Sequence, residues 1–366
     1  MFLSILFALA LIGSGLALFN AVTILTINAR KGVDIPESVA VLIPMRNEAN
    51  HVTEVIQSVC SSELLPSLQI YALNDSSTDG TGQLLAAQAE QLTNLVVLDG
   101  KPLESGWMGK PFACYQLGER AMSDGAEFLV FLDADTRISP KAIAASISEL
   151  KAHRWDFISP HPREIASSPL ARLIQPLMQW SWFVSVPVRL GIALRISSMA
   201  IANGQFIIVR SSAYRQIGGH AAVQNQVLED LEIARSLVKA GCRGGVAVAA
   251  AVADCQMYEN DSDLRAGYSK SLWRAFGSPV GATIAALLLV STQTLPFLLA
   301  LTGSIVAWKI YAVNALAHLI VALKTRSNPI NTFAHPLAII FLVAMIIDSF
   351  VKRINGKLQW KDRSIA

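Results

Sequence analysis

Short apolar runs alternate with amphipathic segments through the middle of the chain. Apolar runs of four to eight residues are typical of strands buried on both faces, and they occur at 39–43, 68–73, 94–98 and 128–132. Helical spacing predicts helices between and around them at 48–61, 79–91 and 110–122. A strand–helix order with short connections predicts an α/β fold with a parallel, doubly wound sheet and right-handed crossovers.

The first 27 residues are apolar and nearly uncharged, which is long enough to cross a bilayer. Arg30 and Lys31 follow this segment, whereas a cleaved signal carries its charge before the apolar core. We therefore predict an uncleaved anchor over 1–28, with its N-terminus outside and the next domain in the cytoplasm. A buried core helix is the alternative.

The C-terminal region is apolar again, with segments near spanning length at 282–301, 305–323 and 333–351. We predict a transmembrane region over 281–351, followed by a basic tail over 352–366. Three crossings would place this tail outside, contrary to the positive-inside rule. Either one segment only dips into the bilayer or the rule is broken, and the sequence leaves both open. The positive residues of the tail are Lys352, Arg353, Lys357, Lys361 and Arg363.

The segment 167–196 departs from the alternation, because it carries a broad apolar stripe that includes Trp180 and Trp182. Three prolines are expected to break it into pieces, at Pro169, Pro176 and Pro187. Tryptophan-rich amphipathic helices too broken to span lie in the membrane interface, which is the prediction for this segment. A pair of core helices is the alternative.

Composition supports a membrane protein. The chain is 52% hydrophobic and 16% charged, with a mean hydropathy of +0.43, which is more apolar than an ordinary soluble enzyme. The net charge of +3 and the lack of a basic run argue against a nucleic-acid partner. The four cysteines are widely spaced, without a Cys-x-x-Cys pair, so neither a zinc site nor a disulfide framework is predicted.

Polar residues follow the predicted strands where a ligand is expected. The run 128–132 ends in Asp133 and Asp135, and open α/β sheets bind ligands beyond the carboxyl ends of their strands. Residues two apart in an extended chain point the same way, so both carboxylates can bind one divalent cation. A simple turn toward a helix capped by Ser139 is the alternative.

The first two strands end in polar stretches as well. Pro44, Arg46 and Glu48 follow the first strand, and 74–81, which includes Asp75, follows the second. Each stretch alone has a structural explanation as a cap or turn, but three of them converge on one edge of the sheet. No phosphate-binding P-loop and no Gly-x-Gly-x-x-Gly is present, so neither a P-loop nor a nicotinamide site is supported.

Taken together, these stretches resemble the inverting family 2 glycosyltransferases, which have the GT-A (nucleotide-diphospho-sugar transferase) fold. The resemblance rests on Pro44-x-Arg46-Asn47-Glu48, Asn74-Asp75-x-Ser77-x-Asp79-x-Thr81 and Asp133-Ala-Asp135. It implies a cytoplasmic GT-A domain over 36–277. It also implies that Pro44, Arg46, Glu48 and Asp75 bind the donor, with Glu48 and Asp75 on the nucleotide. Asp135 and Asp133 would hold Mg²⁺ or Mn²⁺ and the diphosphate.

The stretch Gly106-Trp-Met-Gly109-Lys110 resembles one in membrane members of this family that glycosylate carotenoids or hopanoid-like lipids. By this resemblance Lys110 would be a point charge near the donor phosphates. A solvated lysine at the start of a helix is the alternative.

Two further stretches complete the predicted site. The segment 203–209 is a predicted strand that brings Gly204 close to the donor. Glu229 and Asp230 begin a predicted helix and resemble the catalytic-base pair of the family, with Asp230 as the base. Acidic residues in a first helical turn also stabilise the helix dipole, which is the alternative explanation.

Lys270-Ser-Leu-Trp273-Arg274 lies in a predicted helix over 261–276, where polysaccharide synthases of the family carry Gln-x-x-Arg-Trp. The departure puts a polymer-building function in doubt. Trp273 and Arg274 are predicted on the acceptor or diphosphate side. Their alternative role is an interfacial pair that anchors the next helix.

The sequence thus predicts an integral membrane enzyme, in the plasma membrane with a cytoplasmic catalytic domain. It would transfer one sugar from a nucleotide-diphosphate donor to a carotenoid or similar lipophilic acceptor, with inversion and a metal ion. A polyprenyl-phosphate or polysaccharide-building glycosyltransferase is the alternative enzyme. A non-catalytic membrane scaffold with a vestigial nucleotide pocket is the alternative of another class. The sequence does not indicate an oligomeric state.

Overall fold

The computed structural model describes residues 1–360 and 363–364, and the chain divides into two compact units. The α/β unit comprises 24–163 and 190–255, and the helical unit comprises 1–23, 164–189 and 256–366. Residues 361–362 and 365–366 of the predicted basic tail lie outside the described part of the chain.

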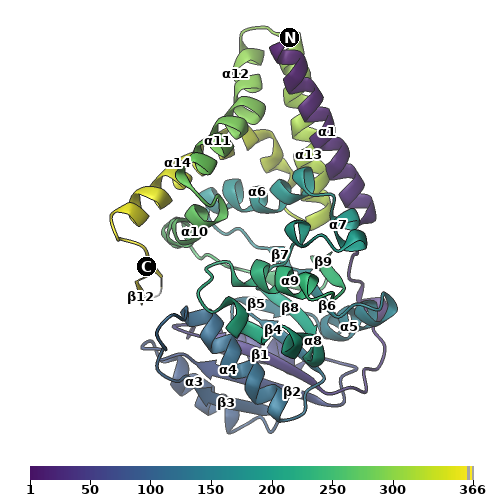
Figure 1. Cartoon of the computed structure of the whole chain (residues 1–366), viewed down its shortest axis with the longest axis vertical. Helices are drawn as coiled ribbons and strands as arrows, with labels where there is room; N and C mark the ends of the chain where they lie inside the picture. Colours follow the sequence, from purple (N-terminus) through teal and green to yellow (C-terminus); the bar gives the residue numbers. More distant parts are fainter. Residues whose placement is uncertain (361–362, 365–366) are drawn as a thin grey trace. The chain divides into compact units, whose positions relative to one another are not determined.

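The α/β unit is built on a seven-stranded sheet of order β3-β2-β1-β4-β8-β6-β9 (Figure 1). Strand β8 runs antiparallel to β4 and β6, so the sheet is mixed rather than wholly parallel as predicted. The start of β8 therefore lies at the same edge as the end of β4, with Phe206 opposite Leu132. The strands are β1 (Val39–Met45), β2 (Leu68–Asn74), β3 (Leu95–Asp99), β4 (Phe128–Leu132), β6 (Phe157–His161), β8 (Phe206–Arg210) and β9 (Gly244–Val248).

Helices cover both faces of this sheet, which explains why its strands are continuous apolar runs. In β1, Val41 and Ile43 pack into one core with α2 and α5, whereas Ala40 and Leu42 pack into the opposite core with α4, α8 and α9. Each fully buried aliphatic side chain contributes about 1.5–3 kcal/mol. The helices of the unit include α2 (Val52–Cys60), α3 (Thr81–Ala89), α4 (Gly109–Ser123), α5 (Ala142–Ala152), α8 (Ser211–Gln216) and α9 (Glu229–Lys239).

Several short elements have no clear pattern in the sequence and were not predicted. Strand β6 contains Ser159, Pro160 and His161, and β9 begins with Gly244 and Gly245, so neither looks like an apolar strand. A small sheet of order β5-β10-β7 is also formed, and β11 pairs with β12. These strands are β5 (Thr136–Ile138), β7 (Arg163–Glu164), β10 (Ala253–Cys255), β11 (Gln359–Trp360) and β12 (Arg363–Ser364), and the short 3-10 helices are η1 (Ala29–Lys31), η2 (Ser197–Met199) and η3 (Gly219–Val223).

The helical unit contains the apolar helices predicted at both ends of the chain. Four of its helical segments are long and apolar enough to cross a membrane: Phe2–Thr23, Pro279–Leu301, Ile305–Thr325 and Pro329–Ile354. Helices α1 and α13 lie side by side in this unit (Figure 1). Its helices are α1 (Phe2–Thr23), α6 (Pro169–Ser185), α10 (Asp261–Ala275), α11 (Pro279–Leu289), the π-helix η4 (Val290–Thr294), α12 (Leu295–Leu301), α13 (Ile305–Thr325), η5 (Pro329–Ala334) and α14 (His335–Ile354).

The amphipathic segment is less broken than predicted. Helix α6 begins at Pro169 and continues through Pro176, so the break expected at Pro176 is wrong. A proline leaves the carbonyl four residues earlier without its helical donor. For Pro176 this is the carbonyl of Arg172, and the Nδ2 of Asn331 donates to it at 3.2 Å.

The break at Pro187 does occur, because α6 and α7 (Val188–Leu194) meet at 59° around it. Asn20 satisfies the backbone there: its Nδ2 donates to the carbonyls of Phe183 and Val186, and its Oδ1 accepts from the N–H of Val188. One buried side chain of α1 therefore replaces three backbone hydrogen bonds that the bend removes.

Candidate active site

An ion-pair cluster lies at the carboxyl end of β4. The Nζ of Lys110 lies 2.7 Å from Oδ1 of Asp133 and 3.3 Å from Oε1 of Glu229. Lys110 comes from the first turn of α4 and Glu229 is the first residue of α9, and both helices pack on the same face of the sheet. Three residues distant in sequence thus meet where the strand order predicted a ligand site.

The surroundings shift the protonation of this cluster. Burial raises the pKa of Asp133 to about 6, although the charge of Lys110 opposes the rise. Burial also works against the charge on Lys110, but Asp133 and Glu229 outweigh it and hold the pKa of Lys110 well above its ordinary value. Lys110 is therefore a fixed cation between two carboxyl groups at neutral pH.

Asp230 is held by two backbone donors. The N–H of Gly204 donates to its Oδ2 at 2.7 Å, and the N–H of Leu231 donates to its Oδ1 at 2.8 Å. Burial, followed by the charge of Glu229, raises the pKa of Asp230 above its ordinary value. A positioned carboxylate with a raised pKa has the properties of a general base.

Gly204 lies in the turn before β8 and leaves room for its neighbours. A Cβ at this position would lie 3.1 Å from Nζ of Lys110 and 3.2 Å from Cβ of Asp230. The turn is fixed by Asn203, whose N–H donates to Oγ of Ser159 at 2.9 Å and whose Nδ2 donates to Nε2 of His161 at 3.1 Å. A side chain here would crowd Lys110 and Asp230, and the hydrogen bonds of Asn203 keep the N–H of Gly204 directed at Asp230.

The segment after β4 is a turn, so the extended backbone predicted across Asp133 and Asp135 is wrong. The N–H of Thr136 donates to the carbonyl of Asp133 at 3.1 Å. Asp133 contacts Lys110, whereas Oδ1 of Asp135 lies 3.4 Å from Sγ of Cys255 in β10. The turn directs the two carboxylates to different partners.

Within the described residues, no group of three or more His, Cys, Asp or Glu side chains is arranged to hold a metal ion. This does not decide the matter, because Mg²⁺ sites commonly use one or two carboxylates and complete their shell with substrate phosphates and water. The oxygen donors of Asp133 and Asp135 suit such a hard cation.

The loops after β1 and β2 are braced against each other. The guanidinium of Arg46 donates to the carbonyls of Asp75 and Ser76, at 2.8 and 3.2 Å. The backbone N–H groups of 47–49 in turn donate to side chains of the second loop. These acceptors are Oγ of Ser77 at 3.0 Å, Oγ1 of Thr81 at 2.9 Å and Oδ2 of Asp79 at 2.9 Å. Ser77, Asp79 and Thr81 thus hold the loops that carry Glu48 and the buried Asp75.

A small cavity of the α/β unit brings six of the predicted residues together: Pro44, Lys110, Asp133, Gly204, Glu229 and Asp230. Arg46, Glu48 and Asp75 follow the neighbouring strands β1 and β2 at the same edge. Trp273 and Arg274 are not among the residues of this cavity and belong to α10 of the helical unit. There Trp273 is buried, with the guanidinium of Arg353 3.6 Å from its ring centroid.

Sequence reasoning missed His220, which also lines the cavity. The hydroxyl of Tyr214 lies 2.8 Å from its Nδ1, and its ring packs 4.8 Å from that of Phe131. Burial lowers the pKa of His220 to about 3, so the ring is neutral at physiological pH. No sequence pattern marks this residue, because η3, the short 3-10 helix that carries it, has no periodicity.

Known proteins are similar to this chain in sequence and in fold. Residues 40–218 match the model of Glycosyl transferase family 2, so the chain carries a glycosyl transferase family 2 domain. The chain is 21% identical over 230 residues to a 4,4'-diaponeurosporenoate glycosyltransferase of Staphylococcus haemolyticus (strain JCSC1435). That match covers 61% of this chain and 57% of the relative, so the chain spans little more than half the length of this curated relative.

Solved structures share the fold. The mannosyltransferase PcManGT from Pyrobaculum calidifontis, in complex with GDP-Man and Mn²⁺, has a TM-score of 0.55 at 16% identity, over 97% of this chain and 99% of that one. S. aureus TarS 1–349 in complex with UDP has a TM-score of 0.43 at 15% identity, over 87% of this chain and 92% of that one. The predicted fold class, a GT-A α/β fold with apolar helices at both ends, is confirmed.

Proposed function

We propose that this protein is a membrane glycosyltransferase that moves one sugar from a nucleotide diphosphate to a hydroxyl or carboxyl group of a lipophilic acceptor, with inversion. The observation that carries the proposal is the placement of Asp230. Its carboxylate is fixed by the N–H of Gly204 and lines the same cavity as Lys110 and Asp133. A base and a charged phosphate-binding group thus share one site.

The donor would lie across the ends of β1, β2 and β4. Glu48 and Asp75 would accept hydrogen bonds from the nucleoside, and Arg46 holds the backbone at Asp75. Lys110 would neutralise the diphosphate. A solved structure of the same fold, described in complex with GDP-Man, supports a nucleotide-sugar donor.

A divalent cation fits beside this cluster. Asp133 and Asp135 would hold Mg²⁺ or Mn²⁺ through carboxylate oxygens, and the similar mannosyltransferase structure is described with Mn²⁺. When bound, the ion supplies Lewis-acid stabilisation of the leaving diphosphate. Because Asp133 is paired with Lys110, donor binding would transfer Lys110 from Asp133 to the phosphates.

Transfer would then be a single displacement. The acceptor oxygen attacks the anomeric carbon, its proton passes to Asp230, and the bond from that carbon to the diphosphate oxygen breaks on the opposite face. The raised pKa of Asp230 suits proton acceptance near neutral pH. Attack opposite the leaving group inverts the anomeric configuration.

A lipophilic acceptor is supported by the four apolar helices and by the distant relative, whose name describes glycosylation of a carotenoid acid. A carotenoid or a similar lipid is the proposed acceptor class. The proposed location is the plasma membrane, with the α/β unit in the cytoplasm.

The function is tested by incubating membranes that contain the protein with labelled nucleotide sugars and Mg²⁺ or Mn²⁺, and then separating the lipid extract. Label in a carotenoid-like fraction is expected. Label in an insoluble polymer or on polyprenyl phosphate would contradict the proposed acceptor and favour the alternative glycosyltransferase. An absence of donor turnover would instead favour a non-catalytic scaffold.

Asp230→Asn tests the base. We expect donor binding to stay within about threefold of wild type, while transfer falls by about 10²–10⁴-fold because no group accepts the proton. Glu232→Gln is the matched control, since Glu232 lies on the same helix and pairs with Arg235 instead. Full transfer by Asp230→Asn would refute the assignment.

A further inference from the structure

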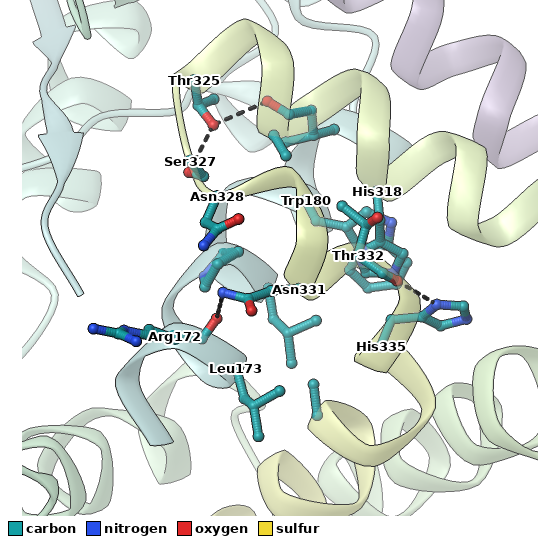
Figure 2. Close-up of a pocket in the computed structure, with 15 residues that line it drawn as sticks. Arg172, Leu173, Trp180, His318, Thr325, Ser327, Asn328, Asn331, Thr332 and His335 are labelled. Carbon is teal, nitrogen blue, oxygen red and sulfur yellow. Dashed lines mark hydrogen bonds between the residues drawn. The ribbon is translucent and has the colours of Figure 1, made fainter. Parts of the chain in front are cut away.

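The helical unit has a cavity of its own, between α6, the end of α13, η5 and the start of α14 (Figure 2). Its apolar wall includes Leu173, Leu177 and Ala322. Its polar wall is formed by Asn328, Asn331 and Thr332, from the connection between α13 and α14, and by two histidines. The cavity therefore has an apolar side and a hydrogen-bonding side.

A stack of four rings fixes the histidines. Trp180 and His318 stack with ring centroids 4.5 Å apart, and His318 and His335 stack at 4.7 Å. Tyr311 continues the stack at 5.2 Å from His335. Rings held on both faces cannot turn to find other partners, so their edge nitrogens stay where the packing places them.

The edge nitrogens of this stack lack partners. Nδ1 of His335 lies 2.9 Å from the carbonyl of Thr332 and must be its donor, so Nε2 of a neutral ring is an acceptor. Among the described residues, Nε2 of both histidines and Nε1 of Trp180 have no hydrogen-bond partner. His318 and His335 are only 5% and 1% exposed. Buried polar groups without partners are costly, and they are expected where a ligand satisfies them.

Irregular backbone on the cavity wall leads to the same conclusion. The α13–α14 connection supplies Asn331, which donates to the Arg172 carbonyl freed by Pro176. Non-helical backbone at membrane depth is tolerated where it is buried in protein or lines a cavity. Intramembrane polar side chains such as His318 are a sign of function for the same energetic reason.

The lining selects the chemistry of the ligand. Among the described residues that line the cavity, Arg172 is the only lysine, arginine, aspartate or glutamate. Its guanidinium points away from the other labelled side chains, and its Nε donates to the carbonyl of Ala166 at 3.4 Å (Figure 2). The remaining polar groups both donate and accept. They suit a hydroxyl or un-ionised carboxyl better than a phosphate.

We propose that this cavity binds the hydroxyl or carboxyl end of a long-chain lipid, with the chain along Leu173, Leu177 and Ala322. This lipid belongs to the acceptor class, an assignment that rests on the proposed function. Binding itself needs neither the donor nor the α/β site, so the two proposals can be tested separately.

The test uses the full-length, detergent-solubilised protein without nucleotide sugar. Photoreactive octadecanol, its carboxylic acid and its methyl ether, each with a diazirine near the polar end, are cross-linked and mapped by mass spectrometry. We expect the alcohol and acid to label peptides covering 172–180 and 318–338 about tenfold more strongly than the ether, which has no donor hydrogen for the Nε2 of His335.

His318→Phe keeps a flat ring in the stack and removes its nitrogens. It should reduce labelling by the alcohol about tenfold and leave labelling by the ether unchanged. His153→Phe is the matched control, because His153 also packs against a tryptophan, Trp155, at 5.2 Å in the α/β unit. Ala322→Leu fills the cavity and retains every polar atom, and it should suppress labelling by all three probes.

Equal labelling by the ether and the alcohol, or wild-type labelling of both His318→Phe and Ala322→Leu, would overturn the proposal. Suppression by excess phosphatidylglycerol but not by unlabelled octadecanol would also overturn it, in favour of a phospholipid headgroup site. Sugar transfer is measured in parallel on the same samples. Transfer without specific labelling would defeat only this inference, whereas specific labelling without any transfer would defeat only the proposed function.

Discussion

At the scale of single residues, one lysine is the shared counter-charge of two carboxylates in the site. Lys110 contacts both Asp133 and Glu229, at 2.7 and 3.3 Å. Two half-buried carboxylates without a counter-charge would repel each other and favour protonation. Lys110 thus keeps the site assembled before a donor arrives, and it is already next to the place where phosphate charge would enter.

The raised pKa of Asp133 predicts that the proposed cation binding depends on pH. Because this pKa is raised to about 6, the carboxyl is protonated below that value and competes with a metal ion for the same oxygens. Mn²⁺ affinity, measured by electron paramagnetic resonance with a nucleoside diphosphate present, should be constant above about pH 7. Below pH 6 it should fall about tenfold per pH unit.

Asp133→Asn is the control for that titration, since it removes the titrating group and should bind Mn²⁺ weakly at every pH. An unchanged Mn²⁺ affinity of the wild-type protein between pH 5 and 7 would contradict the role of Asp133 as a metal ligand.

Gly204 sets the spacing between Lys110 and Asp230. In Gly204→Ala the new methyl group would lie about 3.1 Å from Nζ of Lys110 and 3.2 Å from Cβ of Asp230, so one of them must move. We expect transfer to fall at least about tenfold, because misplaced catalytic groups lose rate steeply. The melting temperature should change little. Gly15→Ala is the control, since a Cβ there meets nothing within 4 Å, and equal transfer by both variants would refute this account.

Sequence reasoning found the residues that mark the ends of strands and helices, such as Asp133, Lys110 and Asp230. It did not find the groups that position them. His161 and Ser159 act on Gly204 from about 44 residues away in the chain, through Asn203. Such a network is created by strand pairing between β6 and β8, and neither β6 nor that pairing has a local signal.

At the scale of elements, strand direction was the main feature beyond the reach of the sequence. An apolar run such as 206–210 predicts a buried strand but carries no information on whether it runs parallel or antiparallel to its neighbours. The antiparallel direction of β8 brings Gln205 to the end of β4, where its carbonyl accepts from the N–H of Asp133 at 3.1 Å. The motif positions were predictable, while their convergence required the sheet topology.

Packing between α10 and α14 gives Trp273 a structural role that can be measured. Its ring lies under the guanidinium of Arg353, and its backbone N–H donates to Oγ of Ser349 at 3.0 Å. Since the side chain is 5% exposed, Trp273→Ala should cost about 3–5 kcal/mol and lower the melting temperature. Trp308→Ala is the control, because Trp308 is 45% exposed. This variant should change the melting temperature little. An unchanged melting temperature for Trp273→Ala would favour the predicted acceptor-side role instead.

At the scale of the whole molecule, contacts within the helical unit favour one of the two alternatives for the basic tail, that one segment only dips into the bilayer. Helix α14 begins beside η4, where Oγ1 of Thr294 donates to the carbonyl of Pro336 at 3.1 Å. It ends beside α10, where Oγ of Ser269 donates to Asp348 at 2.6 Å. Only three residues separate the end of α10 from the start of α11. The C-terminal end of α14, which lies beside α10, is therefore on the same side of the helical unit as the start of the span 279–301.

The direction of α1 relates this side of the helical unit to the two ends of the predicted N-terminal anchor. Leu6 and Ala10 pack with Ile310, and Oγ of Ser14 donates to the carbonyl of Val313, so α1 and α13 run the same way. Figure 1 shows the N-terminus beside the loop between α12 and α13. The C-terminal ends of α1 and α13 therefore lie on the same side of the helical unit as the start of α11. If these helices span a membrane, this arrangement predicts that the α13–α14 connection re-enters it instead of leading into another full crossing.

This topology predicts that the C-terminal tail lies on the cytoplasmic side, together with Arg30 and Lys31, as the positive-inside rule requires. In intact cells a membrane-impermeant maleimide should label Thr302→Cys, in the loop after α12, but not Asn355→Cys, at the end of α14. Permeabilised cells should show labelling of both. The native thiols interfere little, because Cys114, Cys242 and Cys255 are buried and Cys60 is partly buried. Labelling of Asn355→Cys in intact cells would mean that α14 completes a crossing, and the cavity beside His318 would then open toward the opposite face of the membrane.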